Sequence, residues 1–544
     1  MLVIALSFIY IMSLAYIYGN TVSVIVNKTT AYKIKYFTSF IWAGVLIFSV
    51  YAQVFSLFAG VGLTAFLILT LTGIVLAFVC RKDLIKNLKT QLNVKQLVAY
   101  SILLILFSYG TSRGYSHYDT GLYHAQAIRW AEEYGVVKGL ALLHCRFGYN
   151  SAAFPLSALF SFRFFGMFES MHEMAGFFTF VLSLELVDFG HIIRDKKIKL
   201  SDIKRTGIFY YLTLVFNEIV SPASDYFVMS LIFYIILIWV KLIEEDEKLS
   251  TPYSLVCVLS VFACSIKFSA CFIILLTIYP VILMVKEKKA IRIPVYLGLG
   301  FITILPFFIR NVIISGRLLY PSTMLDFFNV DWKISAEMAN YDRMGITAWA
   351  RGVYSTNGYY MSLKEWFPAY FVSQSAMTKL MFMANVLAFI VFIIALIIIL
   401  CKKNKKHYPW ILTVIVIYIN FLVWFVTAPM VRYGYVYLIC PSLLVIGYLL
   451  VDKKWGRVVL IAVCSLFILW KGTALVKYVY EVRNYPYYIT QQPYEKFEVT
   501  PYQMENEIVY LPVNDDRTGY EYFPSVPSAG CKLRGESFKD GFTY

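Results

Sequence analysis

The run LMFMANVLAFIVFIIALIIIL, residues Leu380–Leu400, contains no charged side chain. An α-helix rises about 1.5 Å per residue, so about 20 apolar residues span a hydrocarbon core about 30 Å thick. A second run, VGLTAFLILTLTGIVLAFVC (Val61–Cys80), has the same character. Of the 544 residues, 59% are hydrophobic and 15% are charged, against about 25% charged in a typical soluble domain. The sequence therefore predicts an all-α, polytopic integral membrane protein.

Basic residues concentrate in short stretches between the apolar runs. Examples are RKDLIKNLKTQLNVK, which begins at Arg81, and CKKNKK, which begins at Cys401. Because Lys and Arg accumulate in the cytoplasmic loops of membrane proteins, the net charge of +16 indicates topology, and we expect no nucleic-acid partner. With every basic loop in the cytoplasm, the chain threads through about 12–14 membrane crossings.

This threading divides the chain into six parts. We expect N-terminal transmembrane helices over 1–110, a first large external loop with interfacial helices over 111–172, a transmembrane core over 173–309, a second large external loop over 310–378, C-terminal transmembrane helices over 379–476, and a small external domain over 477–544. In the last part, NEIVYLPV is typical of a strand and NDDRTGY of a turn, which predicts a β-containing tail. Cys145 and Cys531 both fall in external parts, and the sequence leaves open whether they form a disulfide.

Ionisable residues collect on the predicted external side. The stretch SRGYSHYDTGLYHAQAIRW (Ser112–Trp130) follows the fourth crossing and carries Asp119 between His117 and His124. Ionisable groups at membrane depth cost about 2.5–3.5 kcal/mol each on insertion scales, so several on one face indicate a site. The other members follow later crossings or are their neighbours: Asp225, Lys267, Arg310, Asn311, Arg432, Tyr118, Tyr123 and Tyr433.

Asp119 has two interpretations. It opens the helical stretch DTGLYHAQAIRWAEEYG, so its carboxylate can cap the helix N-terminus. It can also act as a general base, and the two roles can coexist. Burial at the edge of lipid raises the pKa of a carboxyl group, and a neighbouring Arg or His lowers it. For His117 and His124, contact with a phosphate and a position in the membrane interface without a specific role are equally favoured.

Arg432, Arg310 and Lys267 are candidate phosphate-binding residues, together with the two histidines. Arg binds phosphate through paired hydrogen bonds, and Lys acts as a point charge. These basic residues outnumber Asp119 and Asp225, which favours an anionic ligand over a closed set of salt bridges. Arg side chains near helix ends also reach lipid headgroups, which is the competing interpretation.

The chain resembles the GT-C superfamily of polytopic glycosyltransferases. The resemblance rests on the acidic residue in SHYDTGLYH, on SPASDY, on the Lys of SIKFSA, on RNVIISGRLLYP and on the Arg of VRYGY. The segment YDTGLYHAQAIRWAEEYGVVKGLALLHCRFGYNSAAFPLSALF and the tail GCKLRGESFKDGF also look like a bacterial group of membrane proteins associated with surface polysaccharide. The first external loop has one acidic candidate in place of the DxD or DxE pair by which some members of the superfamily hold a divalent metal. We therefore assign no metal ligand, and Mg²⁺ or Mn²⁺ stays open as a cofactor.

The resemblance implies an inverting hexosyl or pentosyl transferase in the bacterial cytoplasmic membrane, with its site on the non-cytoplasmic face. The donor would be a polyprenyl-phosphate-linked sugar, and the acceptor a lipid-linked glycan or polysaccharide. Asp119 would deprotonate the acceptor hydroxyl, while the basic residues stabilise the leaving phosphate. One alternative is a polysaccharide polymerase or ligase with a polyprenyl-pyrophosphate donor. Another is a transporter or flippase of lipid-linked glycans.

Overall fold

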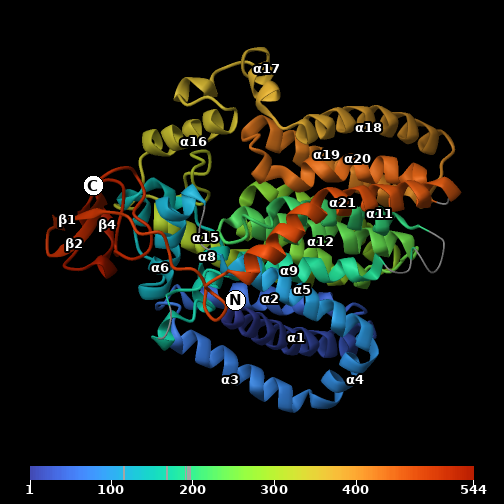
Figure 1. Ribbon diagram of the computed structural model, residues 1–544, viewed down its shortest axis with the longest axis horizontal. Coiled ribbons are helices and arrows are strands. Elements are labelled where there is room, and N and C mark those ends of the chain that lie inside the picture. Colours follow the sequence, from blue (N-terminus) through green and yellow to red (C-terminus); the bar gives the residue numbers. More distant parts are fainter. Residues whose placement is uncertain (114–116, 167–168, 190–191, 193–197, 452) are drawn as a thin grey trace.

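Figure 1 shows the computed structural model of the chain, in which long helices run side by side and the β-strands lie beyond one end of them. The structure describes every residue except 114–116, 167–168, 190–191, 193–197 and 452. Residues 114–116 of the polar stretch that follows the fourth predicted crossing therefore lie outside the described residues.

The N-terminal helices cross closely because glycines stand at one contact. A Cβ atom on Gly19 would lie 1.9 Å from the carbonyl oxygen of Phe40, and one on Gly44 would lie 2.1 Å from that of Ala15. Only residues without a side chain allow the first two helices to approach so far. The helices of this part are α1 (Leu2–Thr30), α2 (Phe37–Phe55), α3 (Leu63–Val79), α4 (Arg81–Gln91) and α5 (Val94–Ser112).

Short helices follow α5 and carry one wall of the site. They are the π-helical turn η1 (Thr120–His124), α6 (Ala125–Glu133), α7 (Leu140–Leu143), the 3-10 turn η2 (Cys145–Gly148), α8 (Ala153–Leu159) and the 3-10 turn η3 (Arg163–Phe165). In α6, Ile128, Trp130 and Ala131 are buried against the rest of the protein.

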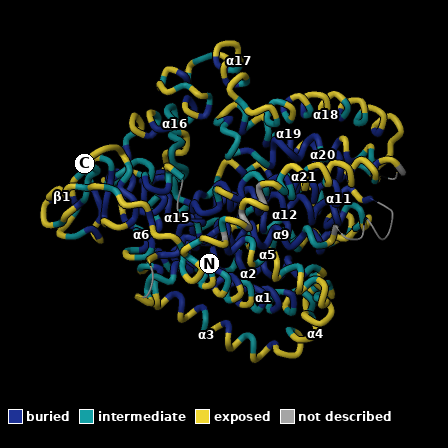
Figure 2. The backbone as a smooth tube through the Cα atoms, in the orientation of Figure 1, coloured by how far each residue is buried: buried dark blue, intermediate teal, exposed yellow. Residues whose placement is uncertain are grey.

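The next helices form the centre of the bundle around α12 (Ser224–Glu244). Every residue of α12 from Asp225 to Leu242 is buried, as expected for a helix that is apolar on all faces. Figure 2 shows α9 and α12 as largely buried, with exposed helices outside them. The other elements here are α9 (Met174–Ser183), η4 (Leu184–Phe189), α11 (Leu200–Val215), η5 (Thr251–Tyr253), α13 (Ser254–Ile266), η6 (Phe268–Thr277), α14 (Ile278–Lys286), η7 (Ala290–Arg292) and α15 (Ile293–Ser315).

Apolar side chains on the outermost helices are exposed. On α18 (Ala376–Cys401), for example, Val386, Leu387 and Ile394 point away from the protein, an arrangement that suits a lipid surrounding. The remaining helices are α16 (Ala336–Ala350), η8 (Thr356–Tyr359), α17 (Leu363–Ser373), η9 (Lys405–His407), α19 (Tyr408–Thr427), η10 (Val431–Gly434), α20 (Tyr435–Leu450) and α21 (Lys454–Arg483).

Within the described ranges, nine helices are long and apolar enough to cross a membrane, or ten if the bent pair α3–α4 is one span. The sequence predicted about 12–14 crossings, and the difference comes from short elements. The helices α9, α11, α13 and α20 have 10, 16, 13 and 16 residues. The chain is thus a multi-pass membrane protein in which several apolar segments are shorter than a full span.

The C-terminal tail contains the predicted β structure. Strand β1 (Val499–Met504) pairs antiparallel with β2 (Glu507–Pro512), and β3 (Lys532–Leu533) pairs with β4 (Phe542–Thr543) beyond the turn η11 (Phe538–Asp540). The buried side chains of the tail share one hydrophobic cluster with α6 and α7. All nine cysteines, each within the described residues, are free thiols, so Cys145 and Cys531 form no disulfide.

Candidate functional site

Arg432 and Asp119 make the central contact of the site. Arg432 lies in η10, the turn between α19 and α20, and its Nη2 atom donates a hydrogen bond of 2.7 Å to Oδ2 of Asp119. The Nε atom of the same guanidinium lies 3.3 Å from Oδ2 of Asp225, in the first turn of α12. One arginine therefore bridges two carboxylates that are far apart in the sequence.

The carboxylate of Asp119 does not cap a helix. Asp119 precedes η1, and its side chain makes no capping hydrogen bond, so the capping interpretation is wrong. The hydroxyls of Thr120 and Ser221 lie 2.8 Å apart and tie the start of η1 to the loop before α12. The turn thus holds Asp119 against Arg432.

Lys267 extends the same group. It follows the last residue of α13, forms an ion pair with Asp225, and places its ammonium 3.7 Å from the ring centre of Tyr433. The hydroxyl of Tyr433 lies 3.4 Å from Nη2 of Arg432. Four separate connections of the chain therefore meet at one place, as the sequence predicted for these residues.

The two histidines beside Asp119 are neutral near pH 7. Nδ1 of His117 lies 3.4 Å from Nη1 of Arg432 and 3.8 Å from Oδ2 of Asp119. Burial and the charge of Arg432 lower the pKa of His117 to about 4, and burial lowers that of His124 to about 3. Neither imidazole therefore supplies a positive charge for a phosphate, although each can exchange a hydrogen bond.

Asp119 is ionised in this arrangement. Burial raises the pKa of its carboxyl group, but the histidines and Arg432 outweigh burial and hold it below its usual value. Since both imidazoles are neutral near pH 7, Arg432 is the effective ionic partner. Although burial opposes it, the charges of Asp225 and Asp119 raise the pKa of Arg432 above its usual range.

Arg310 lies apart from this group and has no ionic partner among the described residues. On α15, its Nε atom donates to Oδ1 of Asn150 at 3.1 Å, and its Nη1 atom donates to the hydroxyl of Ser56. The side chain is buried. Asp119 and Asp225 pair with Arg432 and Lys267, and Arg310 takes no part in these ion pairs. Its neighbour Asn311 donates to the carbonyl of Leu318 at 2.9 Å and stabilises the end of α15.

Two predicted tyrosines point in different directions. The phenol of Tyr118 donates to Asp516 in the tail, so this side chain leaves the site. The ring of Tyr123 lies 4.2 Å from that of His124. Burial and the charge of Asp119 raise the pKa of Tyr123, which keeps the phenol protonated.

Another buried carboxylate lies near the central group, and no motif in the sequence indicates it. Asp342 of α16 accepts hydrogen bonds from Tyr320, at 2.9 Å, and from Tyr149, and it lies 3.6 Å from Nη1 of Arg146. No spacing in the sequence links α16 with η2. The phenol of Tyr123 is close enough to both Asp119 and Arg146 for their charges to act on its pKa.

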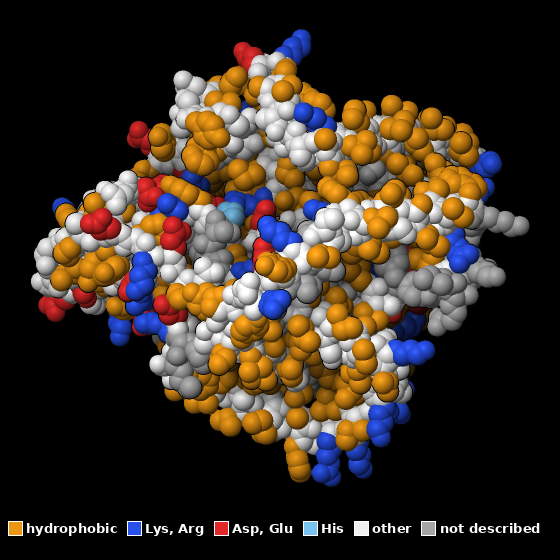
Figure 3. All heavy atoms as spheres, in the orientation of Figure 1, with side chains coloured by type: hydrophobic (Ala, Val, Ile, Leu, Met, Phe, Trp, Pro, Cys, Tyr) orange, Lys and Arg blue, Asp and Glu red, His pale blue; other side chains and the backbone are white. Residues whose placement is uncertain are grey.

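A hollow of about 350 Å³ opens beside the central contact. His117 and Arg432 line one side of it, and Glu218, Met430 and Tyr435 line the rest. Figure 3 shows basic, acidic and histidine side chains together in a hollow between the C-terminal strands and the long helices. A ligand in this hollow would contact Arg432 directly.

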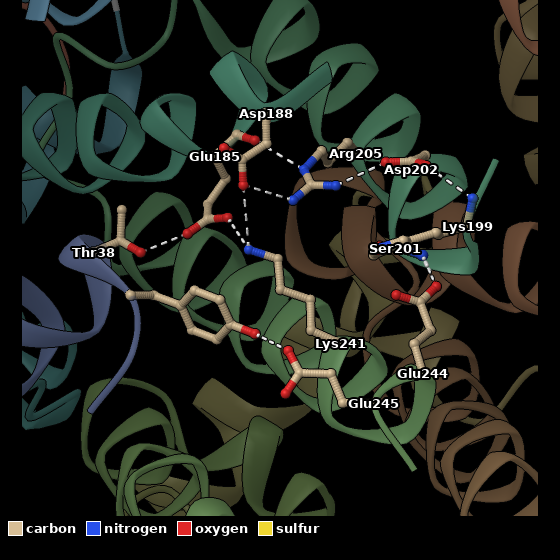
Figure 4. Close-up of polar contacts among 11 residues, drawn as sticks. Thr38, Glu185, Asp188, Lys199, Ser201, Asp202, Arg205, Lys241, Glu244 and Glu245 are labelled. Carbon is tan, nitrogen blue, oxygen red and sulfur yellow. Dashed lines mark hydrogen bonds and ion pairs between the residues drawn. The ribbon is translucent and has the colours of Figure 1, made fainter. Parts of the chain in front are cut away.

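A separate ionic cluster lies at the other end of α12 (Figure 4). Lys241 is 2.7 Å from Glu185 and 3.7 Å from Asp188, and Arg205 is 2.8 Å from Asp202. With about 1.5 Å per residue, this end of α12 is about 24 Å from Asp225. Its charges are paired with one another, so we interpret this cluster as a connection among η4, α11 and α12.

Metal ligands do not gather at the site. In the part of the chain that the structure describes, no three His, Cys, Asp or Glu side chains are grouped so that they could hold a metal ion. Asp119 and Asp225 are each paired with a cation instead. The donor set therefore does not fit Mg²⁺ or Mn²⁺, and we derive no step through a metal.

Comparison with known proteins assigns a family and no activity. No curated protein and no solved structure matches the chain. One family profile, described as a domain of unknown function (DUF8201), matches residues 1–439. This match includes the whole Asp119–Arg432–Asp225–Lys267 group and leaves out the β-containing tail. Because the profile covers most of its length, the chain belongs to the DUF8201 family.

Proposed function

We propose that the chain is an inverting membrane glycosyltransferase of the GT-C type. It would transfer a sugar from a polyprenyl-phosphate donor to a lipid-linked glycan or polysaccharide. The observation that carries the proposal is the convergence of Asp119, Arg432, Asp225 and Lys267 beside a hollow. A carboxylate next to several cations suits a base and a leaving phosphate.

The reaction would begin with an exchange of ionic partners. In the ligand-free protein Arg432 is bound to Asp119. The phosphate of the donor would compete for Arg432 and free the carboxylate. Loss of the cation raises the pKa of Asp119, which makes it a stronger base. The donor thus activates the base that acts on the acceptor.

The bonds that form and break in the reaction then follow from the positions of Asp119, Arg432 and Lys267. The carboxylate of Asp119 takes the proton of the acceptor hydroxyl, and the oxygen forms a bond to the anomeric carbon. The bond from that carbon to the phosphate oxygen breaks with inversion. Arg432 and Lys267 hold the negative charge of the departing polyprenyl phosphate.

The distribution of basic residues supports a site on the non-cytoplasmic face. Figure 3 shows Lys and Arg side chains gathered at the end of the bundle away from the strands, over α4 and the α18–α19 connection. The strands lie at the opposite end (Figure 1), and the turn that follows Asp119 is hydrogen-bonded to the tail that carries them. If the basic end is cytoplasmic, the hollow opens toward the periplasm or cell exterior.

Transport is the main alternative, since buried charges occur at both ends of α12. Between these ends, however, residues 226–240 of α12 include no charged side chain. A flippase would need polar groups along the depth of the bundle to carry a glycan across. The central helix does not offer them, so transfer at one face is favoured.

The test is the profile of lipid-linked glycans in cells that express Asp119→Asn or the wild type. We expect the variant to accumulate an acceptor one sugar short. Asp342→Asn serves as a matched control, because it changes a buried carboxylate outside the central group. An unchanged profile with folded Asp119→Asn protein would refute the proposal.

A further inference from the structure

Two further hollows continue from the one at Arg432. The first, lined by His117 and Gly121 on one side and by Tyr494, Glu495 and Arg517 on the other, shares His117 with the Arg432 hollow. The second shares Tyr494 and Glu495 with the first and reaches Arg129 and Arg163. Neighbouring hollows therefore share lining residues at the contact between the C-terminal tail and the η1–α6 segment, and we call the three hollows together the seam.

The seam has room for a ligand at both ends and is narrow in the middle. The volumes are about 350 Å³ at Arg432, 10 Å³ in the middle and 380 Å³ at Arg129. The larger two fall in the range of small-molecule sites, roughly 300–1,000 Å³. Arg517 lines the middle hollow, and its guanidinium is held at the surface by Asp515, at 2.8 Å, and by Glu495, at 3.7 Å. A ligand that extends through the middle hollow must therefore displace this side chain.

The seam is fixed to the segment that carries Asp119. The amides of Thr518 and Gly519 both donate to the carbonyl of Gly121, at 3.0 and 2.9 Å. The buried side-chain amide of Gln126 donates to the carbonyls of Gly519 and Tyr522 and accepts from the amide of Ser525. These contacts fix the tail against the segment that follows Asp119.

The chemistry of the seam suits an uncharged ligand. Unlike Arg310, its cations already have acidic partners: Lys496 is 3.0 Å from Glu521, Arg163 is 3.7 Å from Glu132, and Arg129 is 3.9 Å from Glu133. The rings of Tyr494 and Tyr520 stack 4.7 Å apart at the wall of the far hollow. Paired acidic and basic side chains offer hydrogen-bond donors and acceptors without net charge. Tyrosines add apolar ring faces and a polar hydroxyl group.

We infer that the seam binds the acceptor, and that the acceptor is an uncharged oligosaccharide that extends from Asp119 to Arg129 and Arg163. This inference rests on the proposed function, because the growing end must meet Asp119. It adds that the protein contacts several sugars behind the growing end of the acceptor. A single sugar would fill only the hollow at Arg432.

The test compares long and short acceptors in proteoliposomes. The long acceptor is the truncated lipid-linked glycan isolated from Asp119→Asn cells, and the short one is the same lipid trimmed to a single sugar by exoglycosidases. A polyprenyl-phosphate lipid extract of the same cells supplies the donor. Glu495→Trp fills the narrow part of the seam at a side chain that is 56% exposed. Glu536→Trp, at an exposed position outside the seam, is the matched control.

We expect Glu495→Trp to lower kcat/KM for the long acceptor by about tenfold and to leave the short one unchanged. Lys496→Trp, at the rim of the far hollow, gives the same readout if Glu495→Trp does not fold. Equal loss with both acceptors, or no change in the ratio for a folded variant, overturns the inference while the proposed function stands. If Asp119→Asn cells accumulate no truncated glycan, both fail.

Discussion

Substitutions that remove the ion pair between Asp119 and Arg432 should change the free energy of unfolding non-additively, because the two side chains are in contact. At 2.7 Å and an effective dielectric constant of about 20, the attraction between the two charges is about 6 kcal/mol before desolvation is subtracted. The side chains are 25% and 15% exposed, so solvent screens part of this energy. We therefore expect a net coupling of about 1–3 kcal/mol, as for contacting residues in one network.

A double-mutant cycle measures this coupling. Arg432→Gln alone leaves Asp119 and Asp225 with Lys267 as their remaining cation and should cost about 3 kcal/mol. Asp119→Asn alone should cost less, because Asp225 still pairs with Arg432. The free energy of unfolding is measured in mixed micelles by tryptophan fluorescence for both single variants and the double variant. Lys496→Gln combined with Arg432→Gln is the control pair, and it should be additive within about 0.5 kcal/mol. A coupling below that value would refute the contact and the mechanism built on it.

Three further predictions concern Arg310, His117 and Gln126. Arg310→Met should leave the free energy of unfolding unchanged or raise it by about 1–2 kcal/mol, because it removes a buried cation that has no acidic partner among the described residues; a large loss of stability would contradict this. The folded protein holds the pKa of His117 at about 4, below its ordinary value of 6.5, so this group contributes stability above pH 6.5 and loses it as the pH falls to 4. Unfolding at pH 7 and pH 5 should therefore differ by less in His117→Asn than in the wild type, and an equal difference would show that His117 is not buried in neutral form. Gln126→Leu removes three hydrogen bonds to the tail and should lower the free energy of local unfolding of the tail by about 2–4 kcal/mol. Limited proteolysis would detect this change as faster cleavage after residue 490. Cleavage at the wild-type rate would count against the seam.

The sequence predicted the central group of the site better than its surroundings. Asp119, Asp225, Lys267 and Arg432 were predicted to meet because each follows an apolar run on the same side of the membrane. That argument fixes the end of the bundle at which a residue lies, and it says nothing of the direction of its side chain. Arg310 shares that end and yet points to Asn150 and Ser56.

Other features could not be predicted because they depend on distant backbones. Asp342 meets Arg146 and Tyr149 only because α16 folds back over η2. The tail was expected to form a small β-containing external domain, and its buried side chains share a cluster with α6 and α7. A short segment buries too little apolar surface by itself, so it completes its core with a neighbour.

The apolar runs and the basic loops by themselves determined that this is a helical, multi-pass membrane protein. Those properties are sums of local terms: each residue prefers lipid or water whatever lies elsewhere in the chain. Only the tertiary structure decided that Arg432 holds both carboxylates, that Arg310 has no acidic partner among the described residues, and that the tail borders the site. Ion pairs and cavities depend on distances of a few ångströms between remote segments, and those distances are set by the packing of all the helices together.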